Sequence, residues 1–270
     1  MQDLVIAIAA ATAFMTLVMS AGWLVQRRAQ NAGWSDVFWT FGTGLTLAAA
    51  ALAPVDLLPA PLARRELLAA LAAAWSLRLG LHIAARVAAS PEDRRYVEMR
   101  ALAKGRFQRD MLGLMLIQAP VSAILALAAL IAAHAPGPLG LRDAAAVAVM
   151  MLAVAGEGLA DAQLVKFKAR GKGGGQICDV GLWAVCRHPN YLFEWLAWFA
   201  YPIMALGYGA ARPWLWVSLA APGLMYVLLN RVSGIPPLER AMLASRGEAY
   251  RRYQARVPAF LPFTKPGASQ

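Results

Sequence analysis

The sequence predicts an all-α, polytopic integral membrane protein with seven transmembrane helices. Hydrophobic residues make up 60% of the 270 residues and the mean hydropathy is +0.51, whereas a soluble domain is closer to half apolar. The apolar residues form seven runs, each near the ~20 residues that a bilayer requires. Basic residues gather in alternate loops between these runs. Because a spanning segment must satisfy its own backbone, and the alternating pattern of a β-barrel is missing, we expect helices.

The seven runs are separated by loops that contain proline and glycine. They are 4–23, 37–53, 67–85, 111–133, 144–164, 192–206 and 214–229. The first run lacks the basic leading segment of a secretory signal peptide, so we interpret it as a transmembrane helix. Turn-forming residues mark the connections, as in Pro136-Gly137-Pro138. We expect these helices to form one membrane domain over residues 1–270.

The distribution of Lys and Arg predicts the orientation of the chain. Alternate loops and the tail hold 21 of the 26 basic residues, in the segments 24–36, 86–110, 165–191 and 230–270. The opposite side holds only Arg64, Arg65, Arg142 and Arg212, and Arg78 lies within a run. Short loops rich in Lys and Arg stay in the cytoplasm. The N-terminus is therefore expected outside and the C-terminus in the cytoplasm.

The net charge of +11 suggests a negatively charged partner. Because the basic residues lie in loops between apolar runs, anionic lipid and an anionic cofactor fit better than nucleic acid. The two cysteines, Cys178 and Cys186, have no metal-ligand spacing and lie near the predicted cytoplasmic face. We expect them to be packing residues, without a structural disulfide.

The segment CRHPNYLFEW, residues 186–195, is the strongest functional signal. It places Arg187, His188, Asn190 and Glu194 at the start of an apolar run. Proline is favoured at the first position of a helix, and residues four apart share a helix face, so Asn190 and Glu194 are expected side by side. A charge within hydrocarbon costs at least about 2.5 kcal/mol, so such residues usually mark function.

A second polar group ends the fifth run. Glu157 and Asp161 are four residues apart, and the basic residues Lys166, Lys168, Arg170 and Lys172 follow before the glycines at 173–175. Cations beside glycines suit phosphate groups. The alternative is a positive-inside anchor with a mobile loop, which is routine in membrane proteins. The glycines do not form a GxGxxG fingerprint, so a nucleotide here would need a non-Rossmann site.

Polar residues also mark the second and third runs. Arg78 and His82 are four apart, and His82 is either a packing histidine or a group that exchanges a proton near neutral pH. Trp34-Ser35-Asp36 is either an interfacial tryptophan with a helix cap or an acid beside His82. These residues belong to a larger set of polar groups within spans or at their edges. Together with Gln118, Glu157, Asp161, Glu194 and Arg231, they predict a water-filled or cofactor-filled cavity that opens to the cytoplasm.

Two further charged segments each allow more than one interpretation. The segment 91–96 is a solvated helix, a lid or part of a cofactor shell. The tail interleaves Tyr250, Tyr253 and Arg256 with other arginines before the sequence PAFLPF. Arginine and aromatic side chains can clamp an adenine nucleotide, or lie at the membrane interface.

These residues resemble the steroid 5-alpha-reductase family in its bacterial form, within a superfamily of sterol reductases and isoprenylcysteine carboxyl methyltransferases. The resemblance rests on GLWAVCRHPNYLFEW and on the ending EAYRRYQARVPAFLPF, and it covers roughly residues 150–263. It implies a seven-helix fold that holds NADPH in a cytoplasm-facing cavity. It further implies reduction of a 3-oxo-Δ4 steroid by hydride transfer to the β-carbon, followed by protonation.

The resemblance also implies roles for single residues. Asp161, Lys168, Asn190, Glu194 and Arg231 match cofactor positions, and Arg187, His188 and Tyr191 belong to the same motif. Ser35-Asp36 stands where the family has a Gln-Glu pair, and His82 stands where it has a tyrosine. Ile235 and Glu239 replace a late His and Tyr of the family. We therefore expect His82, positioned or charged by Asp36, to donate to the substrate oxygen.

The complete expectation is an enzyme of the bacterial inner membrane. Residues 1–135 form its substrate side, and residues 144–263 form its cofactor side. The predicted catalytic residues are Asp36 and His82. The predicted NADPH-binding residues are Asp161, Lys166, Lys168, Arg187, His188, Asn190, Tyr191, Glu194, Arg231, Glu239, Tyr250, Tyr253 and Arg256. The predicted substrate-binding residues are Trp34, Ser35, Trp39, Arg78, Gln118 and Trp198.

Two other classes of protein remain open from the sequence. One is an S-adenosylmethionine (SAM)-dependent membrane methyltransferase, since the RHPNY start occurs in that branch of the superfamily; the basic residues favour NADPH because SAM carries no phosphate. The other is a non-enzymatic transporter or scaffold, which would not need a carboxylate, an amide and an arginine at one helix mouth. The expected partners are a membrane-soluble steroid or lipid and the bilayer, with no nucleic acid and no obligate protein.

Overall fold

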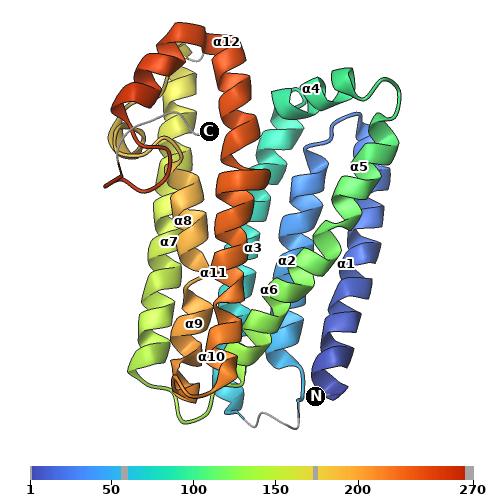
Figure 1. The fold of residues 1–270 in the computed structure, drawn as a ribbon, viewed down its shortest axis with the longest axis vertical. Coiled ribbons are helices and arrows are strands. Elements are labelled where there is room, and N and C mark those ends of the chain that lie inside the picture. The colour runs from blue at the N-terminus through green and yellow to red at the C-terminus, as the bar shows by residue number, and fades with distance from the viewer. Residues whose placement is uncertain (1, 56–59, 173–175, 265–270) are drawn as a thin grey trace. The chain divides into compact units, whose positions relative to one another are not determined.

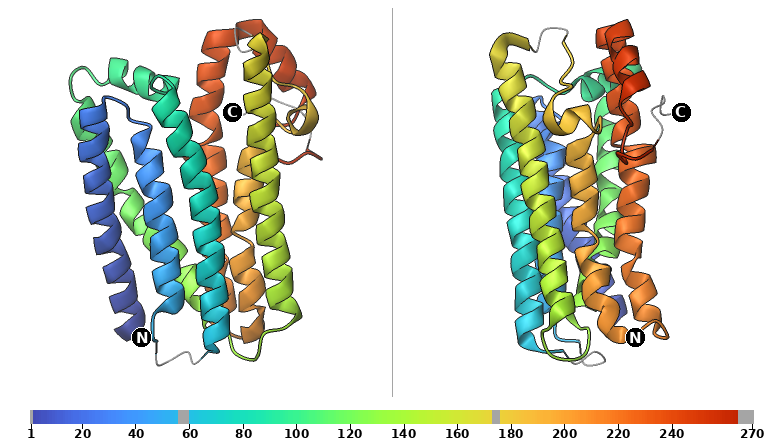
Figure 2. Two further views of the ribbon diagram at one scale, coloured as in Figure 1. Left: turned by 180° about the vertical axis from the view of Figure 1, so that it is seen from behind. Right: turned by 90° about the vertical axis from the view of Figure 1, so that its left-hand side faces the viewer.

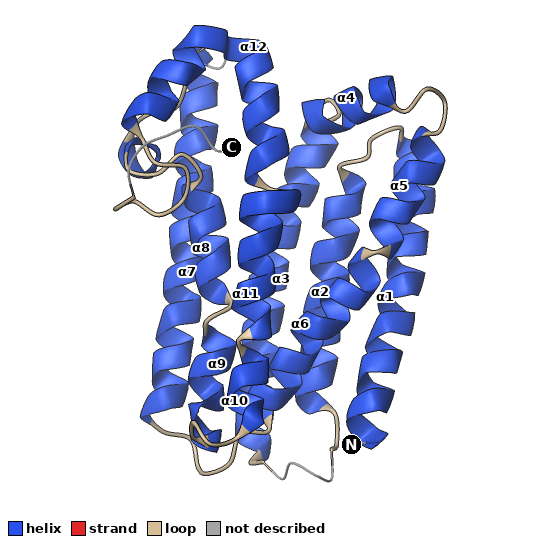
Figure 3. Cartoon of the chain, in the orientation of Figure 1, coloured by secondary structure: helices blue, strands red, loops and turns tan. Residues whose placement is uncertain are grey.

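The computed structural model describes residues 2–55, 60–172 and 176–264, and these residues form helices and loops without strands (Figure 3). Every one of the seven predicted apolar runs is helical along most of its length. The all-α prediction is therefore confirmed for the described residues.

Five helical stretches among the described residues are long and apolar enough to cross a membrane. They are Gln2–Ala29, Leu62–Ala89, Phe107–Ala133, Leu141–Arg170 and Pro213–Arg256. The two other predicted spans fail this test for different reasons. The helix at Trp34–Leu52 carries Asp36 and several threonines, which lower its hydropathy, and the run at 192–206 is divided into two short helices. The count of seven spans stays a prediction.

The chain divides into two compact units, which are described separately. Unit 1 comprises Met1–Val147 and Ala200–Ala221, and unit 2 comprises Ala148–Phe199 and Pro222–Gln270. The elements of unit 1 are α1 (Gln2–Ala29), α2 (Trp34–Leu52), α3 (Leu62–Ala89), α4 (Arg94–Leu102), α5 (Phe107–Leu116), α6 (Gln118–Ala133), α9 (Ala200–Ala205), η3 (Leu206–Tyr208) and α10 (Pro213–Ser218). The helix α7 (Leu141–Phe167) begins in unit 1 and continues in unit 2.

Unit 2 contains the remaining elements. They are η1 (Lys168–Lys172), η2 (Gly181–Ala184), α8 (Pro189–Ala197), α11 (Ala220–Val227, whose first two residues belong to unit 1), η4 (Leu228–Val232) and α12 (Ile235–Arg256). The segments η1 and η4 are π-helical. The helix α12 is kinked at Gly247, whose φ of 52° is left-handed. The last described residues continue beyond α12 to Thr264.

In unit 1, α1, α2 and α3 run side by side, with α2 in the middle (Figures 1 and 2). Small residues let these helices approach closely. A Cβ on Gly44 of α2 would lie 2.1 Å from the Cβ of Ser76 on α3. The hydroxyls of Thr43 and Ser122 lie 2.9 Å apart and join α2 to α6. These polar contacts between helices are typical of membrane bundles.

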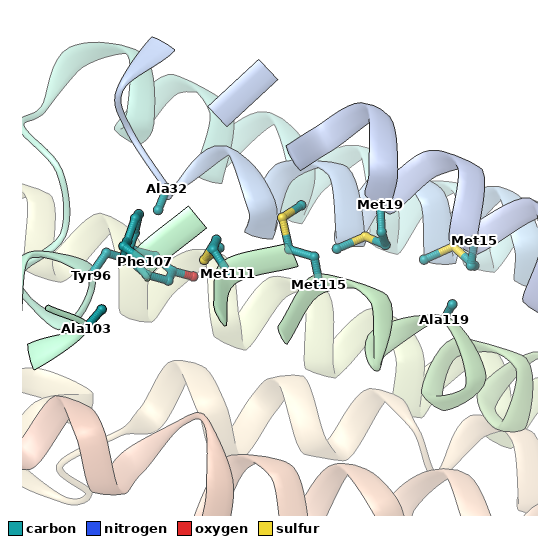
Figure 4. Packing of buried hydrophobic residues seen from close by; sticks show 9 residues of the cluster. All are labelled: Met15, Met19, Ala32, Tyr96, Ala103, Phe107, Met111, Met115 and Ala119. Atoms are coloured by element: carbon teal, nitrogen blue, oxygen red, sulfur yellow. The ribbon is translucent and has the colours of Figure 1, made fainter. Parts of the chain in front are cut away.

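Methionine side chains fill the space between α1 and α5 (Figure 4). Met15 and Met19 extend from α1 toward Met111 and Met115 of α5, and all four are fully buried. The unbranched methionine side chain adapts to irregular gaps, which suits a contact between a straight helix and an interrupted one. The cluster continues to Tyr96 of α4, and so packs α4 against the ends of these helices.

Three helix interruptions have a common cause in proline. The breaks lie at Ile117, at 198–199 and at Leu219, and a proline follows each by three or four residues. Proline lacks the N–H that would bond the carbonyl four residues earlier, and its ring clashes there. These prolines are Pro120, Pro202 and Pro222. The latter two breaks lie at or next to the boundaries between the units.

One loop of unit 1 is held by a buried ion pair. Arg64 is fully buried at the start of α3, and its Nε donates to Asp143 of α7 at 2.7 Å. The same guanidinium donates to the carbonyl oxygens of Ala135, Gly137 and Pro138. Arg64 was expected only as one of the few loop cations on the outer side. Its Nη2 also donates to the second oxygen of Asp143 at 3.1 Å, so the buried guanidinium has five acceptor oxygens, which indicates a structural role.

Candidate functional site

The RHPNY segment of unit 2 forms the turn into α8. His188 is the N-cap residue with φ −132° and ψ 61°, and Pro189 occupies the first position of the helix, as the sequence predicted. Asn190 is half-buried, and its Nδ2 lies 3.5 Å from Asp161 Oδ1 on α7. The structure thus brings together two of the predicted cofactor residues from distant parts of the sequence.

Three carboxylates of unit 2 are buried on α7 and α8. The exposed fraction is 4% for Glu157, 7% for Asp161 and 5% for Glu194. Glu194 accepts a hydrogen bond from Trp198 Nε1 at 3.1 Å, so Trp198 contacts a predicted cofactor residue. Burying a carboxylate is costly, and buried carboxylates are usually paired or functional. Their concentration on two adjoining helices marks this region as the candidate ligand site.

A glycine sets the separation of these two helices. A Cβ on Gly156 of α7 would lie 2.4 Å from the ring of Phe193 on α8. The Phe193 ring therefore packs against Gly156, where only a hydrogen fits. Gly156 directly precedes Glu157 in the sequence, and Phe193 directly precedes Glu194. Gly156 was not singled out by the sequence pattern, because an isolated glycine in a helix has many causes.

Glu239 of α12 is the centre of a buried hydrogen-bond network. Its Oε1 accepts from Arg187 Nε at 2.7 Å, from His188 Nε2 at 3.0 Å and from Tyr250 Oη at 3.2 Å. Its Oε2 accepts from Gln254 Nε2 at 2.9 Å. Burial lowers the pKa of His188, an effect that the Glu239 carboxylate opposes. A neutral His188 that donates to an ionised Glu239 agrees with these contacts.

The C-terminal segment lies against the same turn. The backbone N–H of Arg187 donates to Pro258 O at 2.9 Å, and Cys186 Sγ donates to Phe260 O at 2.9 Å. Both cysteines are buried, and burial raises the pKa of Cys186 to about 11. A thiol with a raised pKa is a poor nucleophile at neutral pH, which fits the predicted packing role.

The remaining tail residues are placed as follows. Tyr253 is buried and donates to Trp183 O, and Arg256 pairs with Asp179 at 3.1 Å on the surface. His188 stacks on Tyr191 with a centroid distance of 5.7 Å. Tyr253 and Arg256 therefore attach the tail to Trp183 and Asp179, whereas His188 and Tyr191 contact each other.

Three of the predicted cofactor-binding cations of unit 2, Lys166, Lys168 and Arg231, are exposed. Lys166 lies in the last turn of α7, Lys168 begins the π-helix η1, and Arg231 lies in the π-helix η4. Single π-turns occur often at functional sites. The glycines at 173–175 lie outside the described residues. All thirteen predicted NADPH-binding residues belong to unit 2.

Asp36 of unit 1 is clamped by residues of α4. Its Oδ2 accepts from Arg95 Nη2 at 2.7 Å and its Oδ1 accepts from Tyr96 Oη at 2.9 Å. Ser35 Oγ lies 3.1 Å from the same Tyr96 hydroxyl. Burial and the Asp36 charge raise the pKa of Tyr96, so its hydroxyl stays a donor. These contacts differ from the expected pairing of Asp36 with His82.

A second ion pair links the segment before α4 to the last turn of that helix. Glu92 accepts from the backbone N–H of Ala32 at 2.8 Å and from Arg100 Nη2 at 2.9 Å. Asp93 is the N-cap of α4 and accepts from Arg95 N at 3.1 Å. The charge-dense segment 91–96 therefore connects the α1–α2 loop to α4. The sequence marked this segment, but no spacing rule identified Tyr96 or Arg95 as the partners of Asp36.

The other predicted residues of unit 1 are less concentrated. Arg78 and His82 are partly buried on α3. Gln118 donates to Leu114 O of the preceding turn at 3.1 Å. Trp39 packs edge-on against Trp75 at 6.4 Å, and Trp34 is partly buried at the start of α2. Trp198, from the same predicted substrate set, belongs to unit 2.

Comparison with known proteins identifies a family for this chain. A family model described as a protein of unknown function, DUF1295, matches residues 22–257. No curated protein matches the chain. No solved structure matches it. The matched range contains the α8 turn, the carboxylates of α7 and α8, and the Glu239 network.

Proposed function

The chain belongs to the DUF1295 family of proteins of unknown function, and from this premise we propose that it is an NADPH-dependent reductase of lipid enones in the bacterial inner membrane. The substrate class is a 3-oxo-Δ4 steroid or a similar membrane-soluble enone, reduced at its Δ4 double bond. The observation that carries the proposal is the set of buried carboxylates and Asn190 around the RHPNY turn of unit 2.

The donors and acceptors of unit 2 fit a dinucleotide. Asp161, Glu194 and Asn190 offer oxygen acceptors for ribose hydroxyls and a carboxamide, and Asn190 offers a donor as well. The exposed Lys166, Lys168 and Arg231 offer cations for phosphate groups. When bound, NADPH supplies a hydride to an electron-poor carbon. The chain itself would bind and orient both reactants and exclude water.

The residues of unit 1 suit the activation of a carbonyl group. A developing negative charge on a substrate oxygen is stabilised by positioned hydrogen-bond donors. His82 stays the proposed proton donor, and the clamped Asp36 provides a fixed negative charge in the same unit. Trp34 and Trp39 provide flat apolar surface for a planar lipid.

Thermal unfolding of the purified protein tests the proposal. A ligand that binds only the folded state raises its stability, by about 2.7 kcal/mol at a hundred times its Kd. NADPH is expected to raise the unfolding temperature more than NADH or SAM. In the Asn190→Ala and Glu194→Ala variants the NADPH-dependent rise is expected to shrink. An undiminished rise in both variants would refute the assignment of these residues.

One observation favours a second candidate, a SAM-dependent membrane methyltransferase of the isoprenylcysteine carboxyl methyltransferase type. Four buried carboxylates lie in unit 2, three of them on α7 and α8, and their negative charge would suit the positive sulfonium of SAM. The same unfolding experiment separates the two proposals, since a shift with SAM alone would favour the methyltransferase.

A further inference from the structure

Glu239 has its acceptor capacity filled by protein donors. An ionised carboxylate offers about four lone-pair positions, and Arg187, His188, Tyr250 and Gln254 supply four hydrogen bonds. The carboxylate is 2% exposed. A group in this state has little capacity to bind a nucleotide, which is the role that its sequence position suggested.

The network instead connects two parts of unit 2. Arg187 and His188 form the turn before α8, whereas Glu239, Tyr250 and Gln254 belong to α12. Arg187 Nη1 also donates to Gln254 O at 3.2 Å and to Val257 O at 2.5 Å. Through these bonds, α12 fixes both the position and the rotation of the first turn of α8.

We infer that Glu239 is a positioning residue that acts through Arg187 and His188. It sets the start of α8, so that Asn190 meets Asp161 and Glu194 faces the ligand. Arg187, His188 and Tyr250 then belong to this anchor and do not contact the nucleotide. The inference rests on the proposed function for its ligand, while the anchor itself can be tested without one.

The buried ion pair between Arg187 and Glu239 allows a direct test of this inference. Removal of one partner leaves an uncompensated buried charge, whereas removal of both is often close to neutral. We expect Glu239→Gln and Arg187→Met each to weaken NADPH binding about tenfold or more, because small displacements of positioning groups have large effects. The double variant is expected to recover binding to within about threefold of the wild type. If both residues touched the nucleotide, the double variant would lose at least as much affinity as the worse single variant.

Hydrogen exchange of the ligand-free protein provides the second readout. Backbone amides of residues 187–194 are expected to exchange faster in each single variant and to return toward wild-type rates in the double variant. Unchanged exchange in both single variants would overturn the anchor. If a single variant does not fold, a folded double variant with near wild-type NADPH affinity still supports the inference, and a double variant without affinity overturns it.

Glu248→Gln is the matched control. It is the same substitution on α12, but Glu248 is exposed and pairs with Arg251 at 3.6 Å on the surface. We expect no change in NADPH affinity or in exchange of residues 187–194. If the wild type shows no NADPH shift at all, the proposed function fails, and the exchange experiment still decides whether Glu239 anchors α8.

Discussion

The carboxylates Glu239 of unit 2 and Asp36 of unit 1 are stabilised by different partners. Glu239 is buried and accepts hydrogen bonds from an arginine, an imidazole, a phenol and an amide. The side chain of Asp36 is 30% exposed, and it accepts hydrogen bonds from one arginine and one phenol. A fully occupied carboxylate is a structural anchor, whereas a partly exposed one retains surface that a ligand can reach.

The hydrogen bond from the Tyr96 hydroxyl to Asp36 yields a prediction about stability. Tyr96→Phe removes the hydrogen bond to Asp36 and leaves the ring in place, so the free energy of unfolding should fall by about 1 kcal/mol. Chemical denaturation in detergent measures the change. Tyr226→Phe is the control, since that ring makes aromatic contacts and its hydroxyl has no hydrogen bond among the described residues. Equal losses in the two variants would contradict the role of the hydroxyl.

The imidazole of His188 yields a prediction about pH. Burial lowers its pKa in the folded chain below the ordinary value of about 6.5. The folded state then binds fewer protons than the unfolded state, so stability is present above pH 6.5 and is lost as the pH falls. Replacing His188 by Gln should flatten this acid-side loss by up to about 1.4 kcal/mol per pH unit. Unfolding temperatures between pH 5 and 8 measure it, and parallel curves for the two proteins would refute it.

At the scale of elements, glycine and proline determine how the helices of each unit meet. Gly156 admits the ring of Phe193 between α7 and α8, and Gly234 lies so close to η4 that a Cβ would meet Leu229 O at 2.4 Å. Proline residues interrupt helices that composition alone would extend. The site of unit 2 therefore depends on backbone positions as much as on its polar side chains.

The glycine between α7 and α8 can be tested directly. Gly156→Ala should destabilise the protein by about 1–3 kcal/mol through overpacking, and it should weaken ligand binding by separating Asp161 from Asn190. Gly113→Ala is the matched control in α5, where a Cβ would meet no atom within 4 Å. It should stabilise the helix by up to about 1 kcal/mol. Recovery in a Gly156→Ala/Phe193→Leu double variant would confirm the cause, and its absence would point elsewhere.

The sequence predicts the elements better than their contacts. Apolar runs are long and strongly patterned, so every one of them is helical, and Pro189 correctly marks the start of α8. The three helix breaks also follow from the positions of the prolines, although the hydropathy of the apolar runs alone predicts uninterrupted helices there. By contrast, the partners of Glu239 and Asp36 come from segments far apart in the chain, and one sequence carries no signal for such pairings. The motif therefore located the α8 turn but did not separate ligand contacts from anchors.

At the scale of the whole molecule, the number of helices that cross the membrane is a testable prediction. Five helical stretches meet the criteria of length and hydropathy, whereas seven runs were predicted. In unit 1, α2 lies between α1 and α3, and its first turn meets α4 through Asp36 and Arg95. Because α1 and α3 both qualify as spans, this arrangement supports a crossing by α2 as well.

Cysteine labelling decides between the two counts. Leu102→Cys, Leu139→Cys and Ala211→Cys would place single thiols at exposed positions of unit 1, in a variant with Cys178 and Cys186 replaced by Ala. With seven spans, residues 102 and 211 lie on opposite sides and residues 139 and 211 on the same side. With five spans, in which α2 and α8–α9 do not cross, residues 102 and 211 share a side. This distinction holds for either orientation of the chain.

The same labelling measures the orientation. The concentration of 21 of 26 basic residues in alternate loops predicts that residue 102 lies in the cytoplasm and that residues 139 and 211 lie outside. A membrane-impermeant maleimide should therefore label Leu139→Cys and Ala211→Cys in spheroplasts, and Leu102→Cys only after lysis. The reverse pattern would place the α8 turn and its basic neighbours outside the cytoplasm. NADPH is a cytoplasmic reductant, so that result would also remove the physical basis for a reductase.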